Sequence, residues 1–120
     1  MKNSRHFKPA EFERCTPSCN IEDMQQSALD MIDRLRDEAG IPLLLSCAYR
    51  SRAWELSKGR SGKSAHTTGD AVDIRCNNTA TRMKIVKAAM KIGIRRIGIG
   101  DSFVHVDNSP TLVQDVIWTY

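Results

Sequence analysis

Two short stretches of the chain carry side chains that could bind a metal ion. SAHTTGDAVDI contains His66 and, seven residues later, Asp73, while FVHVD contains His105 and Asp107. Imidazole nitrogens and a carboxylate oxygen suit zinc, and three such ligands leave a fourth position for water. The two stretches therefore predict a zinc site, provided that the fold brings them together.

Both stretches read as strands in which apolar and polar residues alternate. Side chains along a strand point alternately to its two faces. In AVDIR, Val72 and Ile74 share a face and Asp73 lies on the other. In FVHVD, the two valines lie opposite to His105 and Asp107. If both polar faces line one cleft, Asp73 and His105 converge, and the histidine of the preceding loop can reach the same cleft.

The remaining pattern predicts the elements that must hold these strands. Residues 21–39 have apolar residues at helical spacing and read as an amphipathic helix, with Asn20 as N-cap and Gly40 and Pro42 ending it. Because the strands are bunched toward the end of the chain, we expect an α+β fold, with a small antiparallel sheet packed against two main helices. The other predicted elements are a second helix at 79–92, a helical turn at 51–57 and strands at 42–49, 71–76, 96–100, 103–107 and 115–120.

Composition limits the classes of partner. With 120 residues, the chain is expected to form a single domain over 1–120 and to act as a monomer. Its net charge is +4, but the few aromatic residues do not interleave with the basic ones, so no nucleic acid is expected as partner. No apolar run approaches the length of a membrane span. The N-terminus has no apolar signal core, so we expect a cytoplasmic protein until it is released.

The cysteines form only one close pair, Cys15 and Cys19, while Cys47 and Cys76 stand alone. A zinc site made of four cysteines usually takes two close pairs, so this reading is disfavoured. We expect buried or free thiols, with a Cys15–Cys19 bridge as an alternative under oxidising conditions.

Three motifs, in order along nearly the whole chain, carry a resemblance to a known family. SAHTTGDAVDI fits Ser-x-His-x-x-Gly-x-Ala-x-Asp and resembles the signature of zinc D-alanyl-D-alanine carboxypeptidases and L-alanyl-D-glutamate endopeptidases of phage endolysins. The hedgehog signalling domain shares their fold. CAYRS resembles the family's Ser-Gly-Tyr-Arg-Ser segment, and IGIGDSFVHVD resembles Gly-Ile-Gly…Phe-x-His-x-Asp of a short, phage-endolysin-like branch. The opening HFKPAEF and the closing WTY are also similar to that branch.

This resemblance implies a hedgehog-like fold and a zinc peptidase that cleaves D-amino-acid-containing peptides of peptidoglycan. Carried over by position, the zinc ligands fall on His66, Asp73 and His105. The arginine that contacts substrate falls on Arg50, and Ser64 matches a motif serine beside the bound peptide. The substrate would be reached in the bacterial cell wall.

The chain departs from the family pattern at Cys47 and Ala48, which replace the first two small residues of Ser-Gly-Tyr-Arg-Ser, and again at the catalytic base. Many relatives place an acid three residues before the last zinc histidine, where this chain has Ser102. Asp107, on the same strand face as His105, could be the base or a partner of that histidine, and Asp101 is the other candidate base. In a second register, Asp107 would bind zinc and His105 would transfer protons.

Other interpretations of the same residues stay open. A non-catalytic, zinc-containing module that binds cell wall or another partner could have kept the fold, and a small basic nucleic-acid binder is supported by charge alone. Arg50 could be an ordinary salt-bridge partner. Trp54, Trp118 and Tyr120 are expected to serve packing.

Overall fold

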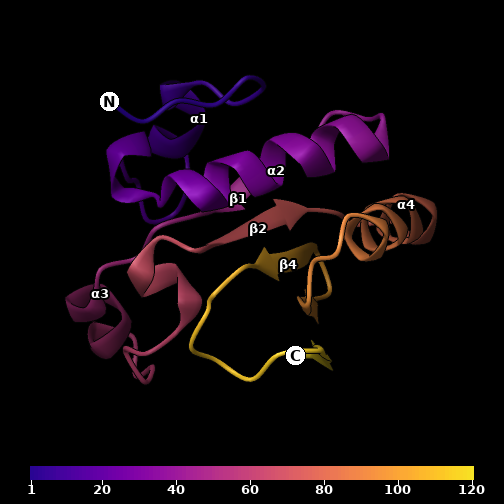
Figure 1. Ribbon diagram of the computed structural model, residues 1–120. Helices are drawn as coiled ribbons and strands as arrows, with labels where there is room; N and C mark the ends of the chain where they lie inside the picture. Colours follow the sequence, from indigo (N-terminus) through magenta and orange to yellow (C-terminus); the bar gives the residue numbers. More distant parts are fainter.

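The computed structural model describes residues 1–120 (Figure 1). The longest helix has 14 residues, and no helix is both long and apolar enough to cross a membrane. The helices are α1 (Pro9–Glu13), α2 (Gln26–Ala39), α3 (Arg52–Ser57) and α4 (Thr79–Lys91), with the 3-10 turns η1 (Ile21–Asp23) and η2 (Ala65–Thr68). The strands are β1 (Leu45–Cys47), β2 (Ala71–Arg75), β3 (Arg96–Ile99), β4 (Phe103–Asp107) and β5 (Val116–Thr119).

One five-stranded sheet, in the order β1-β2-β4-β3-β5, forms the centre of the molecule. The first four of these strands pair antiparallel, as predicted, with β3 and β4 forming the expected hairpin. The edge strand β5 departs from the prediction, because it runs parallel to β3. Its start is fixed beside β3, where the Arg95 guanidinium donates to both carboxylate oxygens of Asp115 at 2.7 and 2.6 Å.

The two main helices, α2 and α4, cover one face of this sheet (Figure 1). Val72, Ile74, Val104 and Val106 point to that face and are at most 1% exposed. The alternation predicted for β2 and β4 is therefore confirmed. Because the apolar side chains fill the helix-covered face, the polar side chains of the same strands emerge on the opposite face, which carries the candidate site.

The helix predicted over 21–39 is interrupted near its start. Met24 is extended, with a ψ of 149°, so the segment splits into η1 and α2. The break has a tertiary cause, since the backbone N–H of Gln25 donates to the carbonyl of Gly69 at 2.9 Å. The side-chain amide of Gln25 donates to the carbonyl of Thr68 at 3.1 Å. The loop that precedes β2 thus docks on the chain where the helix would otherwise run through.

Gly69 makes this docking possible. Its φ is +75°, in the left-handed region, where L side chains are strained. A Cβ at this position would also collide with the backbone carbonyl of Asp23. The segment before β2, predicted as a loop, includes the turn η2, which Gly69 ends. This packing places His66, on η2, over the polar face of the sheet.

Candidate metal centre

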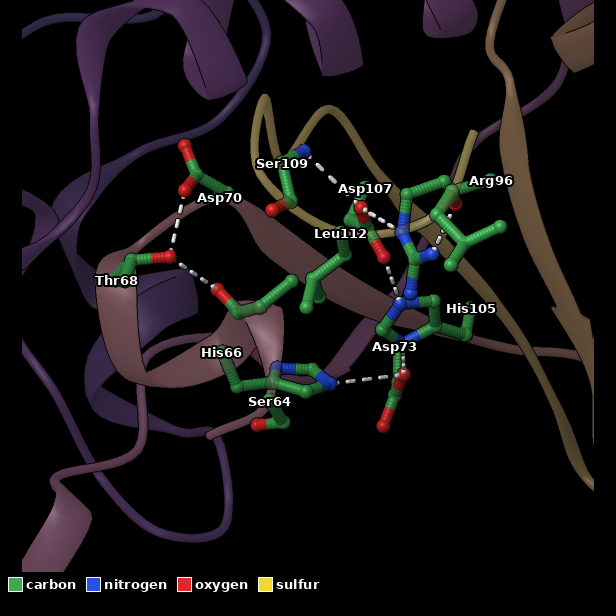
Figure 2. A network of polar contacts seen from close by, with 12 residues as sticks. Ser64, His66, Thr68, Asp70, Asp73, Arg96, His105, Asp107, Ser109 and Leu112 are labelled. Atoms are coloured by element: carbon green, nitrogen blue, oxygen red, sulfur yellow. Dashed lines mark hydrogen bonds and ion pairs between the residues drawn. The ribbon is translucent and has the colours of Figure 1, made fainter. Parts of the chain in front are cut away.

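The register of the sheet brings the predicted ligands together. Asp73 on β2 lies directly opposite His105 on β4, and both point away from the helices. The Oδ1 atom of Asp73 is 3.0 Å from His105 Nδ1 and 3.3 Å from Nε2 of His66. Figure 2 shows both imidazole rings directed at the same carboxylate. The structure therefore gathers His66, Asp73 and His105 in one buried cluster.

Each ring is held from behind by a hydrogen-bond acceptor. His66 Nδ1 lies 2.5 Å from the carbonyl oxygen of Ala48, so this nitrogen donates its proton to the carbonyl. His105 Nε2 lies 2.6 Å from Oδ2 of Asp107 and likewise carries a proton. In a neutral imidazole the other ring nitrogen is then an acceptor. Both remaining lone pairs, at His66 Nε2 and His105 Nδ1, face Asp73.

Three acceptor atoms, His66 Nε2, His105 Nδ1 and Asp73 Oδ1, thus lie close together, and a proton or a cation between them is needed to offset their mutual repulsion. His66 is 2% exposed, His105 4% and Asp73 8%, so water satisfies little of this cluster. Ligating histidines typically donate their second ring N–H to a backbone carbonyl or a carboxylate, which is the arrangement observed for both rings. The donor set and its surroundings therefore fit a zinc ion.

Without an ion, protons shared between the imidazole rings and Asp73 must stabilise the cluster. Burial alone would raise the pKa of Asp73, but the hydrogen bonds to His105 and His66 outweigh it and hold that pKa well below its usual range. Burial would lower the pKa of His105, yet the bonds to Asp107 and Asp73 raise it overall. An ionised Asp73 between two imidazoles is a strongly attractive position for positive charge.

Asp107 lies on the far side of His105 from Asp73 (Figure 2). One of its carboxylate oxygens bonds to His105, and the other accepts from Arg96 Nε at 2.8 Å and from the Ser109 backbone N–H at 3.0 Å. Its side chain is fully buried. Both oxygens are therefore already occupied. Asp101, the other candidate base, is exposed in the turn between β3 and β4.

The row of paired residues continues beyond His105 to the sheet edge. Gly98 on β3 lies opposite His105, and Trp118 on β5 lies beside Gly98. A Cβ at Gly98 would come within 2.7 Å of the indole Nε1, so glycine leaves the space that the indole fills. The indole packs against His105, with ring centroids 5.2 Å apart, and beneath the Arg96 guanidinium at 5.0 Å. Trp118 thus packs, as expected.

A cavity of about 460 Å³ opens beside the cluster. Asp73 is the only carboxylate residue in its lining. Trp54 and Tyr120, which were expected to serve packing, also line this cavity, and no spacing between residues would have placed them there. The lining consists of Thr16, Ser46, Cys47, Arg50, Trp54, Arg60, His66, Asp73, Phe103 and Tyr120.

Arg50 reaches the cavity from a buried ion pair. Its Nε donates to Oε2 of Glu55 at 2.9 Å, and the Ser64 hydroxyl donates to the same oxygen. Glu55 is 1% exposed. Burial opposes ionisation of Glu55, but the bonds from Ser64 and Arg50 lower its pKa overall. Arg50 is therefore both a salt-bridge partner, as one interpretation of the sequence expected, and a residue of the cavity lining. The Ser64 side chain points toward Glu55, and Ser64 is not among the lining residues.

Cys47 is a further potential ligand that the spacing of the cysteines did not reveal. Ligand atoms of Cys47, His66 and Asp73 all lie within 4.8 Å of one another. Burial, with a smaller contribution from Asp73, raises the pKa of the Cys47 thiol to about 12. All four cysteines are buried free thiols, so the alternative of a Cys15–Cys19 bridge is not observed.

The structure is an α+β fold, with helices on one face of the sheet and a polar cavity on the other. The chain belongs to the Peptidase M15 family, whose family model matches residues 5–107. This confirms the family proposed from the three motifs.

A solved structure has a similar fold. It is the crystal structure of the Serratia marcescens L-Ala D-Glu endopeptidase ChiX, with a TM-score of 0.56 and 17% sequence identity. The similarity covers 88% of this chain and 92% of that chain. It confirms the α+β fold class. A comparison with curated protein sequences finds no match.

Proposed function

We propose that the protein is a zinc-dependent peptidase that cleaves D-amino-acid-containing peptides of peptidoglycan. The observation that carries this proposal is the convergence of two imidazole lone pairs on the Oδ1 atom of Asp73, inside the lining of a cavity. Membership of the M15 family supports the peptidase activity. The similar fold of ChiX, described as an L-Ala D-Glu endopeptidase, agrees with a peptidoglycan peptide as substrate.

In this proposal His66 Nε2, Asp73 Oδ1 and His105 Nδ1 hold the ion. A bound zinc supplies Lewis-acid chemistry, because it lowers the pKa of a coordinated water and polarises a carbonyl group. The carbonyl of Ala48 and the carboxylate of Asp107 keep the second ring nitrogens protonated and the rings fixed.

Arg50 is proposed to bind the substrate. Glu55 engages its Nε, and the guanidinium carries further N–H groups in the cavity. Such groups can donate to a substrate carboxylate or carbonyl and stabilise negative charge that develops there. Ser64 supports this binding through Glu55, which it shares with Arg50.

Asp107 is assigned the role of orienting His105, the second of the two roles considered from the sequence. Both of its oxygens already accept hydrogen bonds, which leaves it unsuited to taking a proton from a water in the cavity. This arrangement favours the register in which His105, not Asp107, is the ligand.

The hydrogen bonds that occupy both oxygens of Asp107 also support one alternative function. Because Asp73 is the only carboxylate in the cavity lining, a zinc-containing module that binds cell-wall peptide without cleaving it is the second candidate. In both cases we propose that residues 1–120 act as one monomeric domain, cytoplasmic until it is released to the cell wall.

Hydrolysis of a defined muropeptide separates the two candidates. The zinc-loaded protein and His66→Ala are incubated with the peptide, and the products are identified by mass spectrometry. Cleavage by the wild type and none by the variant supports the peptidase. Saturable binding of the peptide without any cleavage would replace it with the binding module.

A further inference from the structure

Cys47 lies at the end of the same row of residues that forms the candidate metal centre. On β1 it pairs with Asp73 of β2, which in turn pairs with His105 of β4. Side chains of directly paired residues lie on the same face, with their Cβ atoms about 5 Å apart. The register is irregular between Leu45 and Cys47, and the resulting pairing directs the Cys47 thiol toward the carboxylate at the centre of the cluster.

The atoms around Cys47 place its sulfur inside the site. Sγ lies 3.7 Å from Nη1 of Arg50, and Cys47 is 6% exposed in the lining of the cavity. It also lies 3.9 Å from His66 Nδ1, the ring nitrogen that donates to Ala48, so the sulfur lies beside the His66 ring. Two ligands of one tetrahedral zinc ion are about 3.5 Å apart, given usual zinc–nitrogen and zinc–sulfur bond lengths. Ligand atoms of Cys47, His66 and Asp73 lie within 4.8 Å of one another, and His105 Nδ1 lies 3.0 Å from Asp73 Oδ1, so side-chain rotations would bring the four ligands to that spacing.

We propose that Cys47 is a sulfur ligand of the metal ion held by His66, Asp73 and His105. The inference rests on the proposed metal site and adds a fourth protein ligand to it. When the ion binds, the S–H bond of Cys47 breaks, a sulfur–metal bond forms, and the proton leaves to solvent through the cavity. No electrons are transferred in this step.

A thiolate in the site has two consequences. Zinc sites with four protein ligands are closed, whereas catalytic sites keep one position open. In the resting protein the thiolate would therefore hold the position that a catalytic water needs. A sulfur ligand also shifts the preference of the site toward soft ions.

Cobalt spectroscopy tests the sulfur ligand directly and without any substrate. Co²⁺ replaces zinc in the wild type and in Cys47→Ser, Cys47→Ala and Cys76→Ser. Cys76 is also a buried cysteine, but it contacts the carbonyl of Asn78 and not the cluster, so its variant is the matched control. Circular dichroism establishes that each variant is folded.

The proposal expects a thiolate-to-cobalt charge-transfer band in the near ultraviolet for the wild type and Cys76→Ser. Both Cys47 variants should lose this band and keep the visible bands of bound Co²⁺. Bound Co²⁺ with the same spectrum in the wild type and Cys47→Ala would overturn the role of Cys47 and leave the His–Asp–His site standing. Failure of the wild type to bind Co²⁺ at all would overturn both.

Competition between Cd²⁺ and Zn²⁺ gives a second measurement. The ratio of the Cd²⁺ to the Zn²⁺ affinity should fall by about tenfold in Cys47→Ala, because a soft ligand is lost, and stay unchanged in Cys76→Ser. An unchanged ratio in Cys47→Ala would contradict the proposal independently of the spectra.

Discussion

Asp107 holds His105 from behind, with its Oδ2 atom 2.6 Å from Nε2, while Nδ1 on the other edge of the same ring lies 3.0 Å from Asp73. The ring is thus clamped between two carboxylates of different roles. Asp107 is closed off by Arg96 and the Ser109 backbone, whereas Asp73 belongs to the cavity lining. A buried acceptor behind a ligand fixes both the tautomer and the orientation of the imidazole.

Asp107→Asn should therefore weaken metal binding without removing a ligand. We expect the zinc affinity to fall by about 10- to 100-fold, because the amide holds the His105 N–H less strongly and disturbs the contact with Arg96. Competition with a chromophoric chelator measures the affinity. Asp101→Asn, the same change at an exposed position, is the control, and an equal loss in both variants would mean that only the net charge matters.

A side chain at Gly69, where the backbone of Asp23 approaches closely, should lower the free energy of unfolding. Gly69→Ala combines a strained φ with a collision against the backbone of Asp23, so we expect a loss of about 3 kcal/mol in the free energy of unfolding. Gly40→Ala is the matched control, since Gly40 also has a positive φ, +65°, but nothing within 4 Å of the added Cβ. It should cost about 1 kcal/mol. Urea unfolding measures both, and equal losses would show that the contact with Asp23 contributes nothing.

Glu55→Gln should change how the free energy of unfolding depends on pH. The folded pKa of Glu55 lies below its ordinary value of 4.5, so its ionised form stabilises the protein above that pH. The contribution is lost as the pH falls through the lower folded pKa. We expect the variant to be about 2 kcal/mol less stable at pH 7 and the difference to shrink toward pH 3.

Urea unfolding at several pH values measures this difference. Glu13→Gln, at an exposed glutamate, should follow the wild type throughout. A gap between Glu55→Gln and the wild type that stays constant from pH 7 to pH 3 would show that the charge of Glu55 is not the cause.

Arg50→Lys should impair cleavage while zinc binding persists. Lysine keeps the charge but cannot engage Glu55 and a substrate group at once through a planar fork. We expect kcat/KM for a muropeptide to fall by about 100-fold with the zinc content unchanged. Arg52→Lys, at an exposed position two residues on, should keep the wild-type rate. Equal rates for Arg50→Lys and the wild type would remove Arg50 from the site.

Much of this arrangement could be predicted from local pattern. Alternation along β2 and β4 separates the core valines from Asp73 and His105, because the period of a strand leaves no other choice once one face is apolar. The helical spacing of apolar residues likewise predicts α4 and most of α2. These features depend only on neighbours in the sequence.

What the sequence could not show depends on contacts between distant segments. The break at Met24 arises because Gln25 bonds to the loop around Gly69, far along the chain. Arg96 meets Asp107 only through the register of β3 and β4, which the hairpin turn implies but the residue types do not signal. Cys47 reaches the cluster through the pairing of β1 with β2, and no spacing between cysteines could reveal that.

The metal content of the wild type and of Asp73→Ala, prepared side by side and reconstituted with zinc, tests the central claim most directly. The two histidine lone pairs converge on Asp73, so its loss removes the atom at the centre of the ligand set. Elemental analysis should find about one zinc per chain in the wild type and almost none in the folded variant. A wild type that takes up no zinc, or a variant that keeps it, would contradict the proposed metal centre.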